Sequence, residues 1–423
     1  MKIKLQHLEP GWHVIALTLL SGAFVPLWRL QTVGESAAGD PVQQVVLLVA
    51  YSGLILLVFH RRQIGQILIR GWLIWLLVTL AFVSVLWSQA PNLTLRRSIA
   101  LLFATLYGCL LALRYPWSTV LKILSATMAI IIGTSAFSIA LGAEWAAMAY
   151  PMQGWQGIMF HKNALGRIAV LALLVFSIAA QHYRQPWRLG WYGLALTALI
   201  LIIGSNSTTA LITLIALALA GMAIGIGRLI PSFARWRATA LSLSTILPVA
   251  VLGWMYLPDI LKWFGRDPSL TGRVPLWQTL IPIGMSSPLL GYGFGAFWID
   301  PTQMLPLDMA LMRVRFGWAG HAHNGYLDLW LELGVIGLLL ALLIIFWIMY
   351  KSFQQISQST LKHVFFLMFL IFLIIYNVSE AVLTDTNLGK SIFWIVFSYT
   401  YFSYTFQANL VGRSHEISSD FRC

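Results

Sequence analysis

The sequence contains few charged residues and almost no cysteine. Only 10% of its 423 residues are Asp, Glu, Lys or Arg, whereas soluble domains carry about 25%. The low charge and an apolar share of 59% exclude a water-soluble globular protein. The two cysteines, Cys109 and Cys423, exclude both a disulfide framework and a cysteine-based metal site. What is present instead is a series of apolar stretches close to the roughly 20 residues that a helix needs to cross a bilayer.

These apolar stretches predict an all-α polytopic membrane protein of about 12 transmembrane helices, with residues 1–423 forming a single membrane domain. The first stretch has no small-residue cleavage pattern, so we expect it to stay in the protein with its N-terminus in the cytoplasm. The expected spans are residues 12–28, 41–59, 71–87, 98–113, 119–141, 165–181, 189–204, 207–226, 238–257, 324–350, 362–380 and 388–407.

The net charge of +13 is explained by the placement of the basic residues. With both termini in the cytoplasm, 16 of the 27 basic residues and 3 of the 14 acidic residues fall on the cytoplasmic side, which leaves 11 of each outside. This is the positive-inside rule of membrane proteins. Nucleic-acid binding is therefore not expected, and a membrane location with both termini in the cytoplasm is predicted.

The longest polar segment, residues 258–322, is then a periplasmic loop between spans nine and ten, and the last three spans lie within residues 324–407. The stretch from Thr271 to Ile281 predicts a short amphipathic helix at the membrane interface. Residues 291–295 form a glycine-rich turn. We expect one outer loop and no second soluble domain.

Several basic residues lie on the outer side, where the positive-inside rule gives no reason for them. Arg96 and Arg97 lie at the start of span four, Lys162 and Arg167 lie at the start of span six, and the long loop contains Arg273, Arg313 and Arg315. Guanidinium groups bind phosphate oxygens in bidentate fashion, and helix N-termini add N–H donors, so such a cluster is suited to a pyrophosphate. Contact with lipid headgroups is the alternative for any one of them.

His321 and His323 lie where the loop meets span ten. Histidine titrates near neutral pH and can accept a proton from a sugar hydroxyl. Alternatively, the two histidines only cap a helix that has Asn324 as its N-cap. A metal site has weaker support, because the sequence fixes no third ligand.

Asp328 and Glu332 follow at a spacing of four residues on one face of span ten. A buried carboxylate in a membrane helix is costly and usually has a cationic partner. Arg313 or Arg315 is a candidate partner, or the carboxylate orients a histidine. Structural pairing is the favoured role of Asp328. The role of Glu332 is open, and the same holds for Glu380 and Asp385 on the outer side of spans eleven and twelve.

The sequence resembles the family of O-antigen ligases and exopolysaccharide polymerases over most of its length. The most specific match is His323-Asn324 followed, after nine residues, by Gly334-Val-Ile-Gly337. Further matches are the segment 155–163 with Gly166, the segment 271–277 and the segment 291–298, which occur in the family's order and loop placement.

The resemblance implies transfer of a glycan, with inversion, from undecaprenyl pyrophosphate to an acceptor glycan at the outer face of the inner membrane, without a metal or other cofactor. Lipids of that membrane would surround the site. It also implies that His323 is the base and that Arg273 holds the pyrophosphate, which stabilises the charge that grows in the transition state. The candidates to assist Arg273 are Lys162, Arg97, Arg167 and Arg315, and the candidates for supporting roles are His321, Asn324 and Glu332.

One departure from the family bears on the substrate. Ligases of the family carry a Ser-Arg pair at the outer start of the eighth span, whereas residues 204–209 contain no cation here. Together with segments 160–163 and 291–298, this favours a polymerase of lipid-linked repeat units over a ligase that transfers a glycan to lipid A-core. A transporter or flippase for a lipid-linked sugar is the alternative of another class, but no inverted repeat or broken helix is evident in the sequence.

Overall fold

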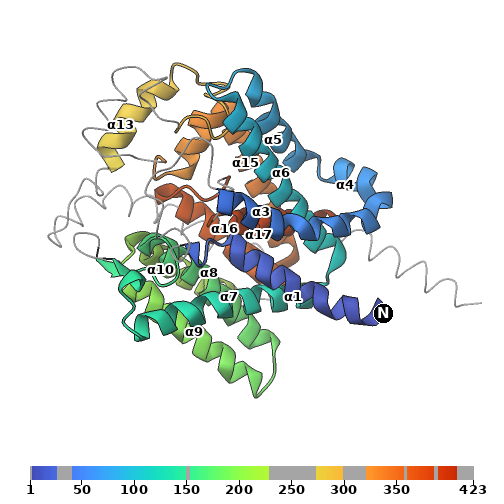
Figure 1. Cartoon of the computed structure of the whole chain (residues 1–423), viewed down its shortest axis with the longest axis vertical. Helices are drawn as coiled ribbons and strands as arrows, with labels where there is room; N and C mark the ends of the chain where they lie inside the picture. The colour runs from blue at the N-terminus through green and yellow to red at the C-terminus, as the bar shows by residue number, and fades with distance from the viewer. Residues whose placement is uncertain are drawn as a thin grey trace, which may run out of the picture.

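A computed structural model of the chain describes residues 2–25, 41–148, 153–227, 273–298, 321–356, 360–384 and 389–406. Most of these residues are helical, as Figure 1 shows. The helices are α1 (Lys2–Leu20), α3 (Pro41–Tyr51), α4 (Ile64–Arg70), α5 (Trp72–Val83), α6 (Pro91–Arg114), α7 (Trp117–Ala140), α8 (Lys162–His182), α9 (Trp187–Gly204), α10 (Thr208–Gly227), α13 (Arg273–Gly284), α15 (Gly325–Ile356), α16 (Leu361–Ser379) and α17 (Ser391–Phe406).

Short elements complete the described part of the chain. Three 3₁₀ helices are η1 (Ser52–Gln63), η2 (Ser84–Leu86) and η3 (Glu144–Ala146). Strands β1 (Ala147–Met148) and β2 (Gly154–Trp155) form an antiparallel pair in which Ala147 lies opposite Trp155. The pair precedes α8 and closes the connection between α7 and α8.

The helices confirm a polytopic membrane protein. Among the described residues, eight helices are long and apolar enough to cross a membrane, or nine if α4 and α5, which meet at an angle of 88°, form one span. Helix α17 has only 16 residues, and the expected span 238–257 lies outside the described residues. The number twelve and the extent of the periplasmic loop therefore stay predictions. The short helix expected near residues 271–281 is present as α13, which buries Leu276 and Leu280, while its amphipathic character and its place at the membrane interface stay predictions.

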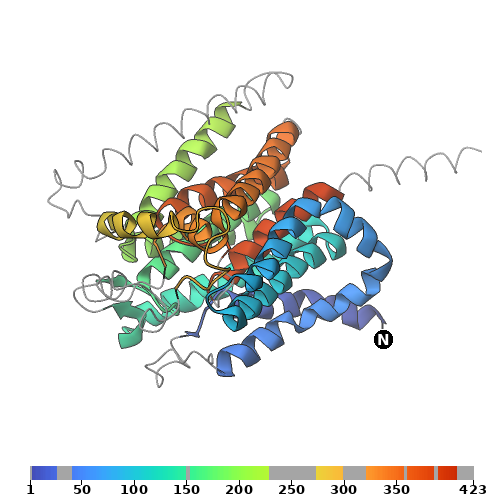
Figure 2. The ribbon, with the colours of Figure 1, turned by 90° about the horizontal axis from the view of Figure 1, so that it is seen from above.

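Helix α17 is the buried centre of the bundle. All of its residues from Ser391 to Thr405 are buried, and Figure 2 shows α17 between the blue helices at the start of the chain and the green helices α8 to α10. Gly108 of α6 lets the two backbones approach, because a Cβ there would lie 2.6 Å from the carbonyl oxygen of Ile395. The indole N–H of Trp394 donates to Thr105 at 2.8 Å. The fold thus brings the last helix against the first half of the chain.

Helix α15 is broken at Gly334, which has φ 65° and ψ −171°. A side chain at this position would collide with the carbonyl of Leu289. Segment 288–293 satisfies the backbone groups that the break leaves free. Its hydrogen bonds, 2.8 to 3.4 Å long, run from Tyr292 N to Leu331 O, from Gly293 N to Glu332 O, from Val335 N to Pro288 O and from Ile336 N to Leu289 O.

This break corrects the sequence analysis, which detected no broken helix. It also gives a physical reason for two of the matched motifs. The glycine-rich segment 291–295 supplies positive φ angles at Gly291, Gly293 and Gly295, and Gly334 supplies the matching break. The two motifs are therefore joined by backbone hydrogen bonds, and we call this contact the backbone junction at Gly334.

The orientation of the chain can be tested with single cysteines in a Cys423→Ser background, in which the remaining Cys109 is buried. We expect Thr302→Cys to react with a membrane-impermeant maleimide in intact spheroplasts, because only this orientation collects the basic residues inside. Gln354→Cys, at the other end of α15, should react only after the membrane is opened. The reverse pattern would overturn the orientation.

Candidate functional site

The segment that contains the two histidines forms a tight turn ahead of α15. Asn324 is the N-cap, because its Oδ1 accepts hydrogen bonds from the backbone N–H groups of Tyr326 and Leu327 at 3.0 and 3.1 Å. The Nδ1 of His321 accepts the backbone N–H of His323 at 3.1 Å, and His323 has a positive φ of 51°. The capping role considered for Asn324 is confirmed. The turn also brings the two imidazoles together, with ring centroids 4.1 Å apart.

Buried polar contacts hold this turn in place. Asp328, only 7% exposed, accepts hydrogen bonds from the indole N–H of Trp298 at 2.8 Å and from the backbone N–H of Ala322 at 2.9 Å. The indole N–H of Trp277 in α13 donates to the carbonyl of Ala322 at 2.7 Å. These contacts agree with a structural role for Asp328 and link the histidine turn to α13.

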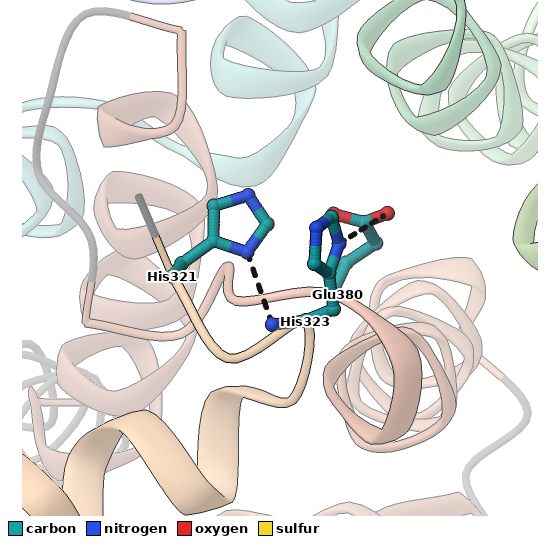
Figure 3. Close-up of side chains that lie close together, drawn as sticks. All are labelled: His321, His323 and Glu380. Atoms are coloured by element: carbon teal, nitrogen blue, oxygen red, sulfur yellow. Dashed lines mark hydrogen bonds and ion pairs between the residues drawn. The ribbon is translucent and has the colours of Figure 1, made fainter. Parts of the chain in front are cut away.

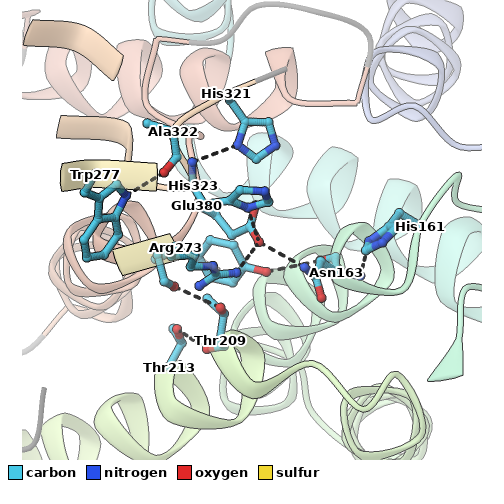
Figure 4. A network of polar contacts seen from close by, with 12 residues as sticks. His161, Asn163, Thr209, Thr213, Arg273, Trp277, His321, Ala322, His323 and Glu380 are labelled. Atoms are coloured by element: carbon cyan, nitrogen blue, oxygen red, sulfur yellow. Dashed lines mark hydrogen bonds and ion pairs between the residues drawn. The ribbon is translucent and has the colours of Figure 1, made fainter. Parts of the chain in front are cut away.

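Glu380, directly after α16, joins residues from distant parts of the sequence, as Figure 3 and Figure 4 show. Its Oε1 accepts hydrogen bonds from Nη2 of Arg273 at 3.1 Å and from Nδ2 of Asn163 at 3.0 Å. The Nδ1 of His323 lies 3.6 Å from the same oxygen. The carboxylate side chain is only 5% exposed, whereas His323 is 34% exposed. His323, the expected base, and Arg273, which is expected to bind the pyrophosphate, therefore both lie next to the same buried oxygen of Glu380.

The surroundings of Glu380 keep it ionised. Burial acts to raise the pKa of its carboxyl, but the nearby His323, His321 and Arg273 outweigh burial and hold the pKa well below its usual range. The site therefore contains one fixed negative charge facing a guanidinium and two imidazoles.

The sequence analysis considered Glu380 only as an outer carboxylate similar to Glu332, and it did not place Glu380 or Asn163 at the site. Each carries a signal that points to a site. Glu380 is an acidic residue at the outer end of a predicted span, where an ionisable group is a candidate for function, and Asn163 ends one of the matched segments. Neither signal names a partner, because the contact between them joins residues 217 positions apart.

The cluster lies where several helices begin. Asn163 is the second residue of α8, its carbonyl accepts the hydroxyl of Tyr376 at 3.1 Å, and α13 and α15 begin at Arg273 and directly after the histidine turn. The hydroxyl of Ser379 donates to Thr209 at the start of α10 at 2.9 Å. Helix N-termini carry partial positive charge and free N–H groups. Together with Arg273, they favour an anionic ligand.

Lys162 and Arg167, expected to assist Arg273, lie on α8 but contact backbone carbonyls. The Nζ of Lys162 donates to the carbonyl of Gln153 at 3.1 Å. Arg167 is 3% exposed, donates to the carbonyl of Gly389 at 3.1 Å and lies over the ring of Phe393. Arg167 thus packs α8 against α17, and a contact with a donor stays a prediction for both residues.

Two other expected residues, Arg97 and Glu332, contact segment 293–295. Arg97 packs against Gly295, where a side chain would collide with it. Glu332 lies at the break in α15, where its carbonyl accepts the N–H of Gly293 at 3.0 Å. Arg315, like Arg313, lies outside the described residues.

The cluster also contains a candidate third metal ligand that the sequence did not reveal. Ligand atoms of His321, His323 and Glu380 lie within 4.8 Å of one another. However, the Glu380 oxygen already accepts from Arg273 and Asn163, and a guanidinium at this distance repels a cation. The donor set therefore favours an anion, and a reaction without a metal stays a prediction.

Two similarities to known proteins bear on this site. Residues 193–342 match the family described as O-antigen ligase, a range that includes His323 and Arg273. The chain is also 28% identical over 314 residues to the exopolysaccharide production protein ExoQ of Rhizobium meliloti (strain 1021), which covers 71% of this chain and 70% of the relative. Together with the polytopic helical fold, these similarities support the resemblance of the chain to O-antigen ligases and exopolysaccharide polymerases.

Proposed function

We propose that the protein is a membrane glycosyltransferase that polymerises undecaprenyl-pyrophosphate-linked oligosaccharide repeat units into exopolysaccharide or O-antigen. It acts at the periplasmic face of a bacterial inner membrane, with residues 258–322 outside and both termini in the cytoplasm. The observation that carries this proposal is the convergence of His323 and Arg273 on one oxygen of Glu380. A base next to a cationic side chain that can bind an anion, at the end of a membrane helix, suits a donor whose leaving group is a lipid diphosphate.

The proposed reaction uses both groups at once. The acceptor hydroxyl attacks the anomeric carbon of the donor sugar from the face opposite the leaving group, so the configuration inverts. His323 takes the proton of that hydroxyl. The bond to the diphosphate breaks and its electron pair leaves with the diphosphate, whose growing charge is neutralised by Arg273. Neither role requires a further cofactor.

The polymerase proposal has support from residues 204–209. This segment contains no cation, although it reaches the cluster through the contact between Thr209 and Ser379. A ligase meets a phosphorylated lipid A-core and profits from an additional cation on the acceptor side, whereas a polymerase meets a neutral sugar. The name of the Rhizobium relative, an exopolysaccharide production protein, points in the same direction. The alternative is a ligase, as the description of the matched family has it.

A transporter or flippase is less well supported. Transporters bind substrate at broken helices near the middle of the membrane. Helix α15 is broken, but the backbone groups freed at Gly334 bond to segment 288–293 and are thus not open to a substrate. The polar cluster lies nine or more residues before the break, at the start of the helix.

The decisive experiment for the proposed function is glycan size analysis of a deletion strain. We expect it to lose the long polysaccharide, to accumulate single repeat units on the carrier lipid and to keep attachment to lipid A-core intact. Complementation with the wild-type gene should restore the polymer, and complementation with His323→Ala at equal expression should not. Long chains that remain on the carrier lipid without transfer to lipid A-core would identify a ligase instead.

A further inference from the structure

The Oε1 of Glu380 accepts two hydrogen bonds, and a third potential donor, the Nδ1 of His323, lies nearby. Arg273 and Asn163 occupy its two lone pairs at 3.1 and 3.0 Å. The Nδ1 of His323 lies at 3.6 Å, beyond hydrogen-bond distance, and it is buried without a hydrogen-bond partner. A buried ring nitrogen without a partner costs free energy unless another state of the protein satisfies it.

The accessible edge of His323 lies away from this nitrogen. The ring is 34% exposed as a whole, whereas Nδ1 is buried. A hydrogen bond from Nδ1 to a carboxylate would fix the tautomer in which Nε2 is free to accept a proton. The position of Glu380 is right for this orientation of His323, but Arg273 holds its oxygen.

We propose that Glu380 is a positioning residue that exchanges Arg273 for His323 when the lipid diphosphate of the donor binds. The diphosphate replaces Glu380 as the partner of Arg273, because it can bind the guanidinium in bidentate fashion. The released lone pair of Glu380 then accepts the Nδ1–H of His323. This inference rests on the proposed function, because it deepens the roles of His323 and Arg273.

The exchange links donor binding to the base. Before binding, Glu380 neutralises Arg273, and its Oε1 lies 3.6 Å from the Nδ1 of His323, which is longer than an orienting hydrogen bond. After binding, the proton of the acceptor hydroxyl passes to Nε2, while the proton on Nδ1 stays there and the carboxylate stays ionised. The enzyme would thus complete its catalytic arrangement only with a donor in place, which is a form of induced fit.

Glu380→Gln separates this role from a structural one. The amide keeps the shape and an oxygen for Asn163, but it removes the charge that holds Arg273. We therefore expect the variant to bind undecaprenyl diphosphate in nanodiscs about threefold to tenfold more tightly. Turnover of the lipid-linked repeat unit extracted from a deletion strain should fall roughly 10- to 100-fold, because His323 loses its orienting carboxylate. Tighter binding with slower turnover is not expected from a loss of structure.

Two further variants serve as controls. Asp328→Asn removes another buried carboxylate of the site, one that contacts Trp298 and Ala322, and should not tighten binding. Glu380→Asp keeps the charge and should turn over faster than Glu380→Gln. The exchange is wrong if Glu380→Gln weakens binding and turnover together, if it turns over like the wild type, or if Glu380→Asp is no better.

The binding measurement is independent of the reaction. If the wild type does not lengthen the repeat unit, the proposed function fails, while the comparison of diphosphate binding between the wild type and Glu380→Gln still decides the exchange. Tighter binding by the variant would then support it, and equal or weaker binding would overturn it.

Discussion

His323→Ala is expected to lower the rate of polymer formation by about 10² to 10⁴-fold, the usual effect of removing a general base. His323 faces the cluster with a buried Nδ1 next to Glu380 and a partly exposed ring, so alanine removes the only proton acceptor that the proposed mechanism uses. The measurement is the initial rate at which purified protein in nanodiscs lengthens the lipid-linked repeat unit. Expression and monodispersity must match the wild type.

His321→Ala is the matched control for this prediction. His321 belongs to the same turn, and its Nδ1 accepts the backbone N–H of His323. Its loss should loosen the turn without removing the base, so we expect a milder decrease. Full activity of His323→Ala at normal expression would exclude the catalytic role and leave His323 a residue that shapes the turn before α15.

Arg273→Ala is expected to lower kcat/KM by roughly 10² to 10³-fold, the effect of removing one preorganised group that stabilises charge in a transition state. Arg273→Lys should recover little of this, because an ammonium group cannot form the bidentate contact of a guanidinium with a diphosphate. The side chain of Arg273 is 18% exposed, so solvent only partly screens its charge. The same nanodisc assay measures both variants.

Arg188→Lys provides the control for the arginine variants. Arg188 lies at the start of α9, where it donates to the hydroxyl of Tyr192 and lies over the ring of the same residue. We expect no change in turnover from this substitution. If Arg273→Lys turns over the donor as well as the wild type does, Arg273 is a structural or headgroup contact.

The membrane-crossing helices were largely predictable from the sequence. The expected spans 189–204 and 207–226 correspond to α9 (Trp187–Gly204) and α10 (Thr208–Gly227). The bilayer imposes this agreement, because a chain in hydrocarbon must satisfy all its backbone groups within one apolar helix. The N-cap at Asn324 was predictable for a similar reason, since capping depends on neighbours within a few residues.

The breaks and the centre of the site were not predictable in the same way. Gly334 lies in an apolar stretch that continues on both sides, and only the bonds to segment 288–293 make its broken backbone stable. Glu380 has no local motif, and its role depends on Arg273 and Asn163, which reach it from 107 and 217 positions away. Such contacts are set by the packing of helices, about which a single sequence gives no direct information.

The backbone junction at Gly334 has a consequence for insertions into the chain. Segment 288–293 is anchored to α15 by backbone hydrogen bonds. The side chain of Asp328 in α15 accepts a hydrogen bond from Trp298 and another from the backbone N–H of Ala322. An insertion between these two anchors would leave Arg273 and His323 where they are. Its cost in closure entropy would be small, about 0.6 kcal/mol for each doubling of length. A change of length between Trp298 and Ala322 is therefore expected to leave the contact between His323 and Glu380 in place.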